Sequence, residues 1–207
     1  MKVLLVNGSP HKNGCTYTAL CEVAKGLESE GVEHEILHLD NDTPGCNACR
    51  FCKKKGKCSI DDVVNDALER LDEFDGFVFG SPVYYAGPAG QLTSFMDRLF
   101  FASAGRMAYK PAAAVVSCRR GGSTASLDRL NKYFTISNMP VVPSQYWNQV
   151  HGNTPEEVVK DLEGMQIMRT LGRNMGWMLK CIEAGKKAGV SVPVPEEHAW
   201  TNFIRSD

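Results

Sequence analysis

Four cysteines lie within thirteen residues of this chain, close enough together to bind one metal centre. They follow the spacing C-x2-C-x2-C-x5-C and are Cys46, Cys49, Cys52 and Cys58. Three thiols spaced three residues apart can converge on one point, and the fourth can complete the set. This suits a [4Fe–4S] cluster, in which each thiolate ligates a different iron. A structural zinc site usually has two C-x2-C pairs a dozen or more residues apart. From the spacing alone, a cluster, a zinc ion and a cysteine-rich turn without metal all stay open.

A second group of residues could bind a phosphate. The segment from Asn7 to Thr16 joins the first predicted strand to the first predicted helix, where backbone N–H groups and the helix dipole favour an anion. It contains neither the G-x-G-x-x-G dinucleotide pattern nor the G-x4-G-K-[ST] nucleotide pattern. It therefore suits one terminal phosphate, with Ser9 and Thr16 as hydroxyl donors. The alternative is an ordinary turn rich in small residues.

Two further loops are predicted at the same edge of the sheet, where open α/β folds bind ligands. In the loop Ser81–Pro88, the adjacent Tyr84 and Tyr85 could hold a flat aromatic ring. In the loop 117–123, glycines allow a ligand to approach, and Arg119 or Arg120 could balance an anionic ring. The alternatives are a packing role for the first loop and a solvated surface for the second.

The first loop and the loop Ser81–Pro88, together with Phe95-Met96-Asp97-Arg98, resemble the NADPH-dependent FMN reductase branch of the flavodoxin-like superfamily over residues 1–143. The cysteine spacing resembles that of the iron–sulfur flavoproteins of this superfamily. The resemblance implies bound FMN, with its phosphate on the first loop and its isoalloxazine ring beside the second. The predicted cofactor-binding residues are Ser9, His11, Asn13, Gly14, Cys15, Thr16, Pro82, Val83, Tyr84, Tyr85, Gly87, Ser117, Arg119 and Gly122. Relatives often carry arginine at His11 and asparagine at Cys15, so here more of the phosphate binding would fall to the backbone.

Apolar runs predict strands at 3–6, 32–39, 77–79 and 112–117, and Val141-Val142 as a short edge strand. Apolar residues at helical spacing predict helices between these strands. Together with the resemblance, this alternation predicts an α/β, flavodoxin-like, doubly wound parallel sheet of five strands in the order 2-1-3-4-5, with helices on both faces. Because the cysteine loop follows the carboxyl end of the second strand, we expect it at the edge that carries the flavin.

The chain divides into two predicted parts. Residues 1–143 would form the FMN-binding domain, which includes the cysteine-rich loop 46–58. Residues 144–207 would add an insertion, a long helix from the Thr154 cap to about Lys187, and an extended tail. We expect Gly164, Gly172 and Gly176 to interrupt that helix. This second part would pack on the same domain or at a subunit interface.

Size and composition limit the possible functions. The 207 residues are 43% hydrophobic with a formal net charge of −1, which suits one well-buried domain. Near-neutral charge predicts no binding to nucleic acid or to a membrane surface. No apolar run approaches the roughly 18 residues of a membrane span. Eight cysteines without an export signal predict a reducing compartment, and hence the cytoplasm.

Together these features predict an FMN-dependent oxidoreductase. NAD(P)H or a reduced carrier would supply electrons, which would pass through FMN, and through a cluster if one binds, to a quinone, a nitro or azo compound, or a flavin. No catalytic side chain is predicted, because the flavin carries the chemistry. The alternative is a non-catalytic flavodoxin-like carrier that exchanges electrons with ferredoxin-type partners. The resemblance also implies a homodimer or homotetramer.

Overall fold

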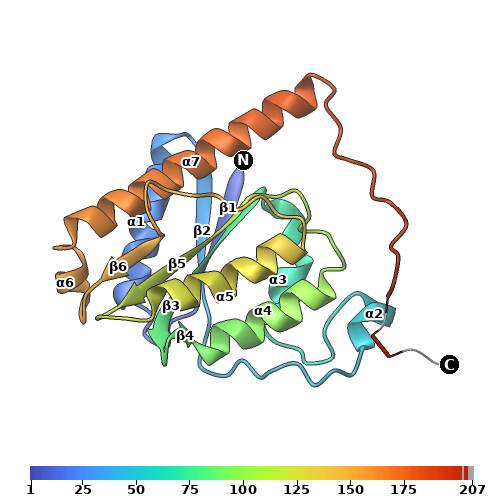
Figure 1. The fold of residues 1–207 in the computed structure, drawn as a ribbon, viewed down its shortest axis with the longest axis horizontal. Coiled ribbons are helices and arrows are strands. Elements are labelled where there is room, and N and C mark those ends of the chain that lie inside the picture. The colour runs from blue at the N-terminus through green and yellow to red at the C-terminus, as the bar shows by residue number, and fades with distance from the viewer. Residues whose placement is uncertain (202, 205–207) are drawn as a thin grey trace.

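A parallel sheet forms the centre of the molecule (Figure 1). The computed structural model describes residues 1–201 and 203–204. The parallel strands are β1 (Lys2–Asn7), β2 (Glu33–His38), β3 (Gly76–Tyr84), β5 (Ala112–Cys118) and β6 (Gln149–His151), in the order β2-β1-β3-β5-β6. The two-residue β4 (Gly87–Pro88) pairs antiparallel with the end of β3. With β4 set aside, the order is the predicted 2-1-3-4-5, and the predicted fold class is confirmed.

Helices cover both faces of this sheet. One face is covered by α1 (Cys15–Ser29) and α7 (Leu162–Lys187), and the other by α3 (Val63–Glu69), α4 (Gly90–Ala102) and α5 (Ser123–Ile136). Side chains alternate along each strand, so Val3 and Leu5 pack toward α1 and α7 while Leu4 and Val6 pack toward the other face. Burial on both sides explains why β1 is a continuous apolar run. Three elements are short: α2 (Phe51–Lys55), α6 (Pro155–Val158) and the 3-10 turn η1 (Leu71–Glu73).

The fifth strand lies later in the chain than predicted. Val141 makes only an isolated bridge to Ala112, and the strand beside β5 is Gln149–His151. Pro140 and Pro143 flank the predicted strand and cannot donate backbone hydrogen bonds, which limits pairing there. The sheet therefore continues past residue 143.

The glycines of the long helix do not interrupt it, contrary to expectation. The break falls instead between α6 and α7, where Asp161 accepts a hydrogen bond from Gly164 N (2.9 Å) and caps α7. Gly172 faces Gly26 of α1, and a Cβ added to either glycine would lie within 3 Å of the other's Cα. These glycines therefore let the two helix backbones touch.

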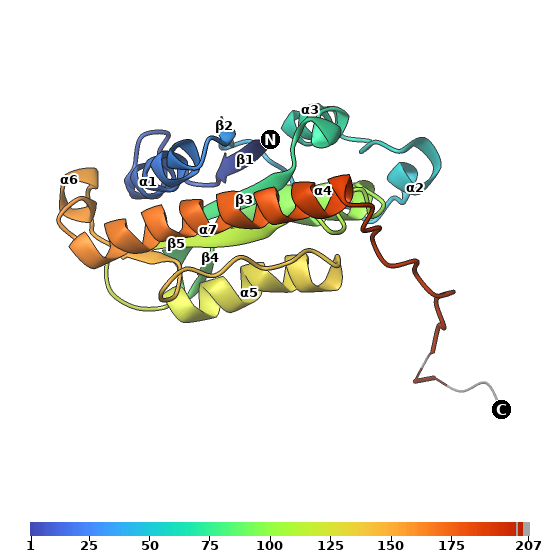
Figure 2. The same ribbon diagram turned by 90° about the horizontal axis from the view of Figure 1, so that it is seen from above.

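After α7 the chain continues as an extended segment without regular structure. It leaves the body of the molecule, as Figure 2 shows. The Tyr109 hydroxyl donates to the Pro193 carbonyl (3.5 Å) near its start, and Trp200 is largely exposed. No helix in the part of the chain that the structure describes is long and apolar enough to cross a membrane.

The contact between α1 and α7 predicts opposite effects for two glycine substitutions in α7. Gly172→Ala should lower the free energy of unfolding by about 1–3 kcal/mol, because its methyl group meets the α1 backbone. Gly185→Ala should raise it by about 0.5–1 kcal/mol, because its nearest neighbour, Val190 Cβ, is 3.8 Å away and alanine favours the helix. Urea denaturation of both variants in the cofactor-free state measures this, and effects of the same sign would contradict it.

Candidate cofactor site and cysteine cluster

The ends of four parallel strands enclose a cavity of about 260 Å³ at the carboxyl edge of the sheet. Parallel strands place their following loops at one edge, which is where α/β folds bind ligands. Nine of the twelve lining residues belong to the predicted cofactor set. The lining consists of Ser9, His11, Cys15, Thr16, Pro82, Val83, Tyr84, Ser117, Cys118, Arg119, Gly152 and Asn153.

A buried asparagine at the end of β1 holds the first loop in shape. Asn7 Oδ1 accepts from Ser9 N (3.2 Å), and its Nδ2 donates to the Lys12 carbonyl (3.0 Å) and to Nδ1 of His38 (3.2 Å). Burial lowers the pKa of His38, which favours the neutral ring that can accept this bond. Ser9 Oγ in turn accepts from His11 N (3.1 Å). The loop is therefore preformed by the protein's own hydrogen bonds.

The first turn of α1 opens at this cavity without a side-chain cap. Gly14 occupies the N-cap position, so no side chain accepts from the first-turn N–H groups. The buried hydroxyls of Thr16 and Ser117 lie 2.9 Å apart. Burial raises the pKa of the neighbouring Cys15 thiol, so the thiol stays neutral and does not repel an anion. This arrangement suits the binding of one phosphate group.

The two tyrosines predicted to bind the flavin ring lie on a tight hairpin, but only one of them lines the cavity. Tyr84 lines the cavity, whereas Tyr85 is fully exposed. Tyr85 and Ala86 form the two-residue turn between β3 and β4, and both have positive φ angles (49° and 57°). L-residues in this region cost about 1–2 kcal/mol each. Gly122 lies against this turn, since a Cβ there would be 2.7 Å from the Ala86 Cα. The hairpin and the third loop therefore pack together.

Five predicted cofactor residues do not line the cavity, and three lining residues were not predicted. The first group is Asn13, Gly14, Tyr85, Gly87 and Gly122. Of these, Gly14, Gly87 and Gly122 shape the loops. The unpredicted residues are Cys118, Gly152 and Asn153. β6 brings the last two into the site, and its three residues carry too little pattern to be found from the sequence.

The four cysteines line a second, smaller cavity of about 20 Å³, together with Arg98. Cys46 and Cys49 are exposed, while Cys52 and Cys58 are half-buried. The Cys49 thiol lies 3.2 Å from Ser59 Oγ, and this hydrogen bond lowers its pKa. Across the described residues, no three His, Cys, Asp or Glu side chains are arranged to hold a metal ion. The fold therefore gathers the thiols at one place but does not close them into a ligand set.

The cysteine cavity lies away from the cofactor cavity, contrary to expectation. α4 begins at Gly90 beside the hairpin, and the part of α4 that lines the cysteine cavity runs from Arg98 to Ala102. The helix from Gly90 to Arg98 spans roughly 12 Å. Figures 1 and 2 both place α2 at the end of the molecule away from β4 and α6. The reason is the extended segment 39–50, which carries the chain from the end of β2 to α2.

The residue types of both cavities fit the predicted groups. The first combines an uncapped helix N-terminus, buried hydroxyls and Arg119, which suit the phosphate of FMN and the negative charge of its reduced ring. The second presents four sulfur donors beside a guanidinium, and this donor set matches the thiolate ligation of an iron–sulfur cluster.

Comparisons with known proteins agree with these features. Residues 1–154 match the family model described as NADPH-dependent FMN reductase. The chain is 33% identical over 192 residues to an iron–sulfur flavoprotein of Methanocaldococcus jannaschii, a match that covers 88% of this chain and all of that protein. The structure resembles an NAD(P)H:quinone oxidoreductase of Methanothermobacter marburgensis (TM-score 0.67, 15% identity, 84% of this chain and 96% of that one). It also resembles a flavodoxin, WrbA-like protein of Agrobacterium tumefaciens (TM-score 0.62, 16% identity, 87% and 98%).

The cavity predicts which of two threonines on α1 contributes to FMN binding. Thr16→Ala should weaken FMN binding by about 1 kcal/mol, or about fivefold, because one hydroxyl partner is lost. Thr18→Ala is the matched control, since its hydroxyl donates to the Gly14 carbonyl (3.2 Å) and does not line the cavity. Titration of FMN into the cofactor-free variants, followed by quenching of flavin fluorescence, measures both. Equal affinities in the two variants would refute the assignment.

Proposed function

The chain belongs to the NADPH-dependent FMN reductase family, and we propose that this FMN-dependent oxidoreductase transfers electrons from NAD(P)H to a small acceptor. Acceptor classes consistent with an open flavin site are quinones, nitro and azo compounds, and free flavin. A reduced ferredoxin-type carrier is the alternative donor. The observation that carries the proposal is the convergence of four strand ends on one cavity that combines a phosphate-binding turn, an aromatic side chain and an arginine.

The protein's part is to bind and orient the cofactor. When bound, FMN supplies the electron-transfer chemistry. The turn from Ser9 to Thr16 would hold its phosphate, and Pro82, Val83 and Tyr84 would border its ring. Arg119 lines the same cavity, where its positive charge would stabilise negative charge on the reduced ring. Burial raises the pKa of the Cys118 thiol, so this neighbour stays neutral.

We further propose that Cys46, Cys49, Cys52 and Cys58 hold a [4Fe–4S] cluster. Their gathering on one cavity and the similarity to a protein named iron–sulfur flavoprotein support this. Exposed lysines on and after α2 would offset the charge of four thiolates. Because the cysteine cavity lies away from the cofactor cavity of its own subunit, such a cluster is better placed to exchange electrons with the flavin of a neighbouring subunit.

Exposed apolar side chains on α7 support a homo-oligomer. Most apolar side chains of α7 are buried against α1, but Trp177 is 63% exposed and Leu162 is 78% exposed. Trp177 also lines a largely apolar groove with Ile182 and Val190, and continuous apolar surface of this kind is typical of protein interfaces. We propose a homodimer or homotetramer in a cytoplasmic setting.

The cofactor content of protein purified without oxygen tests this function. We expect a yellow protein that releases FMN, identified by mass spectrometry, and that contains about four irons per chain. NADPH or NADH should bleach the flavin absorbance within the time of an enzymatic turnover. Release of FAD would contradict the cofactor assignment. Bleaching by a reduced ferredoxin, but not by either nicotinamide, would favour the carrier function.

The oligomeric proposal predicts a mass above that of one chain. Light scattering at micromolar concentration should give at least twice 22.8 kDa. Trp177→Ser should shift the equilibrium toward monomer, because it removes apolar area from the proposed interface. Gln145→Ser, which changes an exposed polar residue, is the control. A monomer mass for the wild-type protein would refute the proposal.

A further inference from the structure

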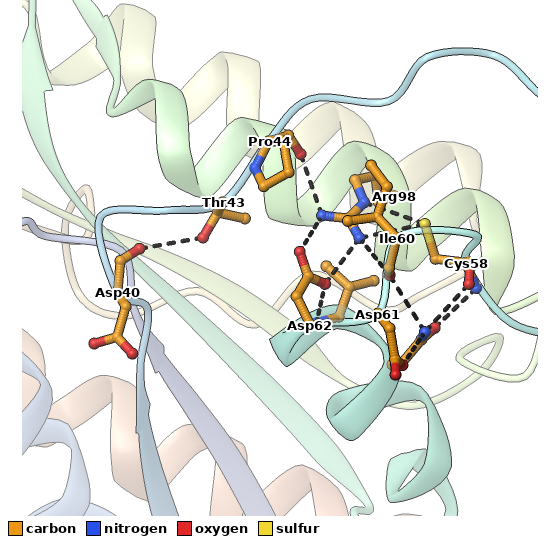
Figure 3. Close-up of polar contacts among 10 residues, drawn as sticks. Asp40, Thr43, Pro44, Cys58, Ile60, Asp61, Asp62 and Arg98 are labelled. Carbon is orange, nitrogen blue, oxygen red and sulfur yellow. Dashed lines mark hydrogen bonds and ion pairs between the residues drawn. The ribbon is translucent and has the colours of Figure 1, made fainter.

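One of the four cysteines is held by the protein core, and the residue that holds its sulfur is a buried arginine. Arg98 is 2% exposed, and its guanidinium donates to Cys58 Sγ from both Nε and Nη2, each at 3.3 Å. Figure 3 shows the Arg98 side chain pointing from α4 toward this sulfur. Two N–H groups from one planar fork restrict the position of the sulfur more than a single donor could.

The charge of this arginine is balanced locally. Arg98 Nη1 and Nη2 donate to the two carboxylate oxygens of Asp62 at 2.7 and 2.8 Å. Its remaining contacts are the carbonyls of Pro44 (3.2 Å) and Ile60 (3.1 Å), one on each side of the cysteine loop (Figure 3). A guanidinium stays charged when buried, so removal of either partner of the Arg98–Asp62 pair would leave an uncompensated charge.

The main chain of the same cysteine is held from a different helix. Asn65 of α3 is almost fully buried, and its Oδ1 accepts from Cys58 N (2.8 Å). Its Nδ2 donates to the carbonyls of Cys58 (3.2 Å) and Ile60 (3.3 Å). α3 is itself started by Asp62, whose Oδ1 accepts from Val64 N (3.1 Å). Cys58 is therefore fixed by its sulfur to α4 and by its backbone to α3.

The other three cysteines are held differently. Cys46 and Cys49 are exposed, and the only hydrogen bond to a thiol of these three within the described residues joins Cys49 to Ser59. Ala48, before Cys49, and Arg50, after it, both have positive φ angles of 57°. The donor set is thus asymmetric: a buried side chain binds the Cys58 sulfur, whereas Cys46 and Cys49 are exposed and Cys52 is half-buried on α2.

We propose that Arg98 and Asn65 are positioning residues for the cluster: they hold Cys58 in place as the first ligand, and the segment 46–52 brings the other three cysteines to it. Arg98 has a second effect through its N–H groups, because hydrogen bonds to ligand sulfurs raise the reduction potential of iron–sulfur clusters. This inference rests on the cluster proposed above.

Three variants prepared without oxygen separate these effects. Arg98→Lys keeps the positive charge but loses the planar guanidinium whose two N–H groups donate to Cys58 Sγ. Asn65→Ala loses the backbone clamp but keeps the N–H groups on the sulfur. Arg106→Lys is the control, because Arg106 also pairs with an aspartate (Asp72, 2.7 Å) and a carbonyl (Leu68, 3.0 Å) but does not contact the cysteine loop. Circular dichroism and FMN content report the fold of each variant.

Iron release to a chelator and the reduction potential of the cluster are the readouts. Arg98→Lys should lose iron at least about tenfold faster than wild type and show a lower potential. Asn65→Ala should also lose iron faster, at an unchanged potential, and Arg106→Lys should match wild type in both.

The possible failures are distinguishable. Wild-type protein with bound FMN but less than one iron per chain would overturn the proposed cluster, and the inference with it. Loaded wild type together with an Arg98→Lys variant of unchanged iron release would overturn the inference alone. If Arg98→Lys does not fold, wild-type iron release in Asn65→Ala overturns the positioning role.

Discussion

The burial of one permanent charge organises the stretch of chain from Pro44 to Asp62. Arg98 extends from α4 into the protein, where its guanidinium must find partners because it cannot lose its proton. It finds Asp62, two carbonyls and the Cys58 sulfur. Since those partners come from a stretch that includes the cysteine turn and the start of α3, the single side chain determines how this stretch passes α4. Asn65 of α3 adds hydrogen bonds to the backbone of Cys58 and Ile60, which hold the same stretch from its other side.

A second constraint, the close approach of α1 to its neighbours, determines the cofactor cavity. Gly26 and Gly172 let α7 pack closely against one side of α1 on the same face of the sheet. Gly80 of β3 lets its inner side approach the sheet, since a Cβ there would lie 2.9 Å from Thr16 Cγ2. Held from both sides, the helix presents its uncapped N-terminus to the loop that Asn7 preforms. The geometry for binding a phosphate therefore depends on small residues that do not line the cavity.

The two sites lie at different places on one scaffold, and the difference follows from how the chain leaves each strand. The loops after β1 and β3 turn back at once into α1 and into the hairpin, so their residues stay at the edge of the sheet. The segment after β2 runs extended instead and reaches α2 at the far end of α4. In the proposed oligomer, the cysteine cavity of one subunit would exchange electrons with the flavin of a neighbouring subunit, which connects the proposed oligomer to the proposed electron transfer.

The sequence alone determined what depends on short-range spacing and periodicity. It predicted the strands through β5, most of the cavity lining and the grouping of four thiols, because each is encoded within a few neighbouring residues. Tertiary contacts decided the rest. Partners distant in the chain determine the pairing of β6, the contact between Gly26 and Gly172, and the burial of Arg98. The outward position of Tyr85 depends on a strained backbone conformation that packing must stabilise. Local pattern carries no information about such partners, so only the folded chain could show that Cys58 is fixed and that the cysteines lie away from the cofactor cavity.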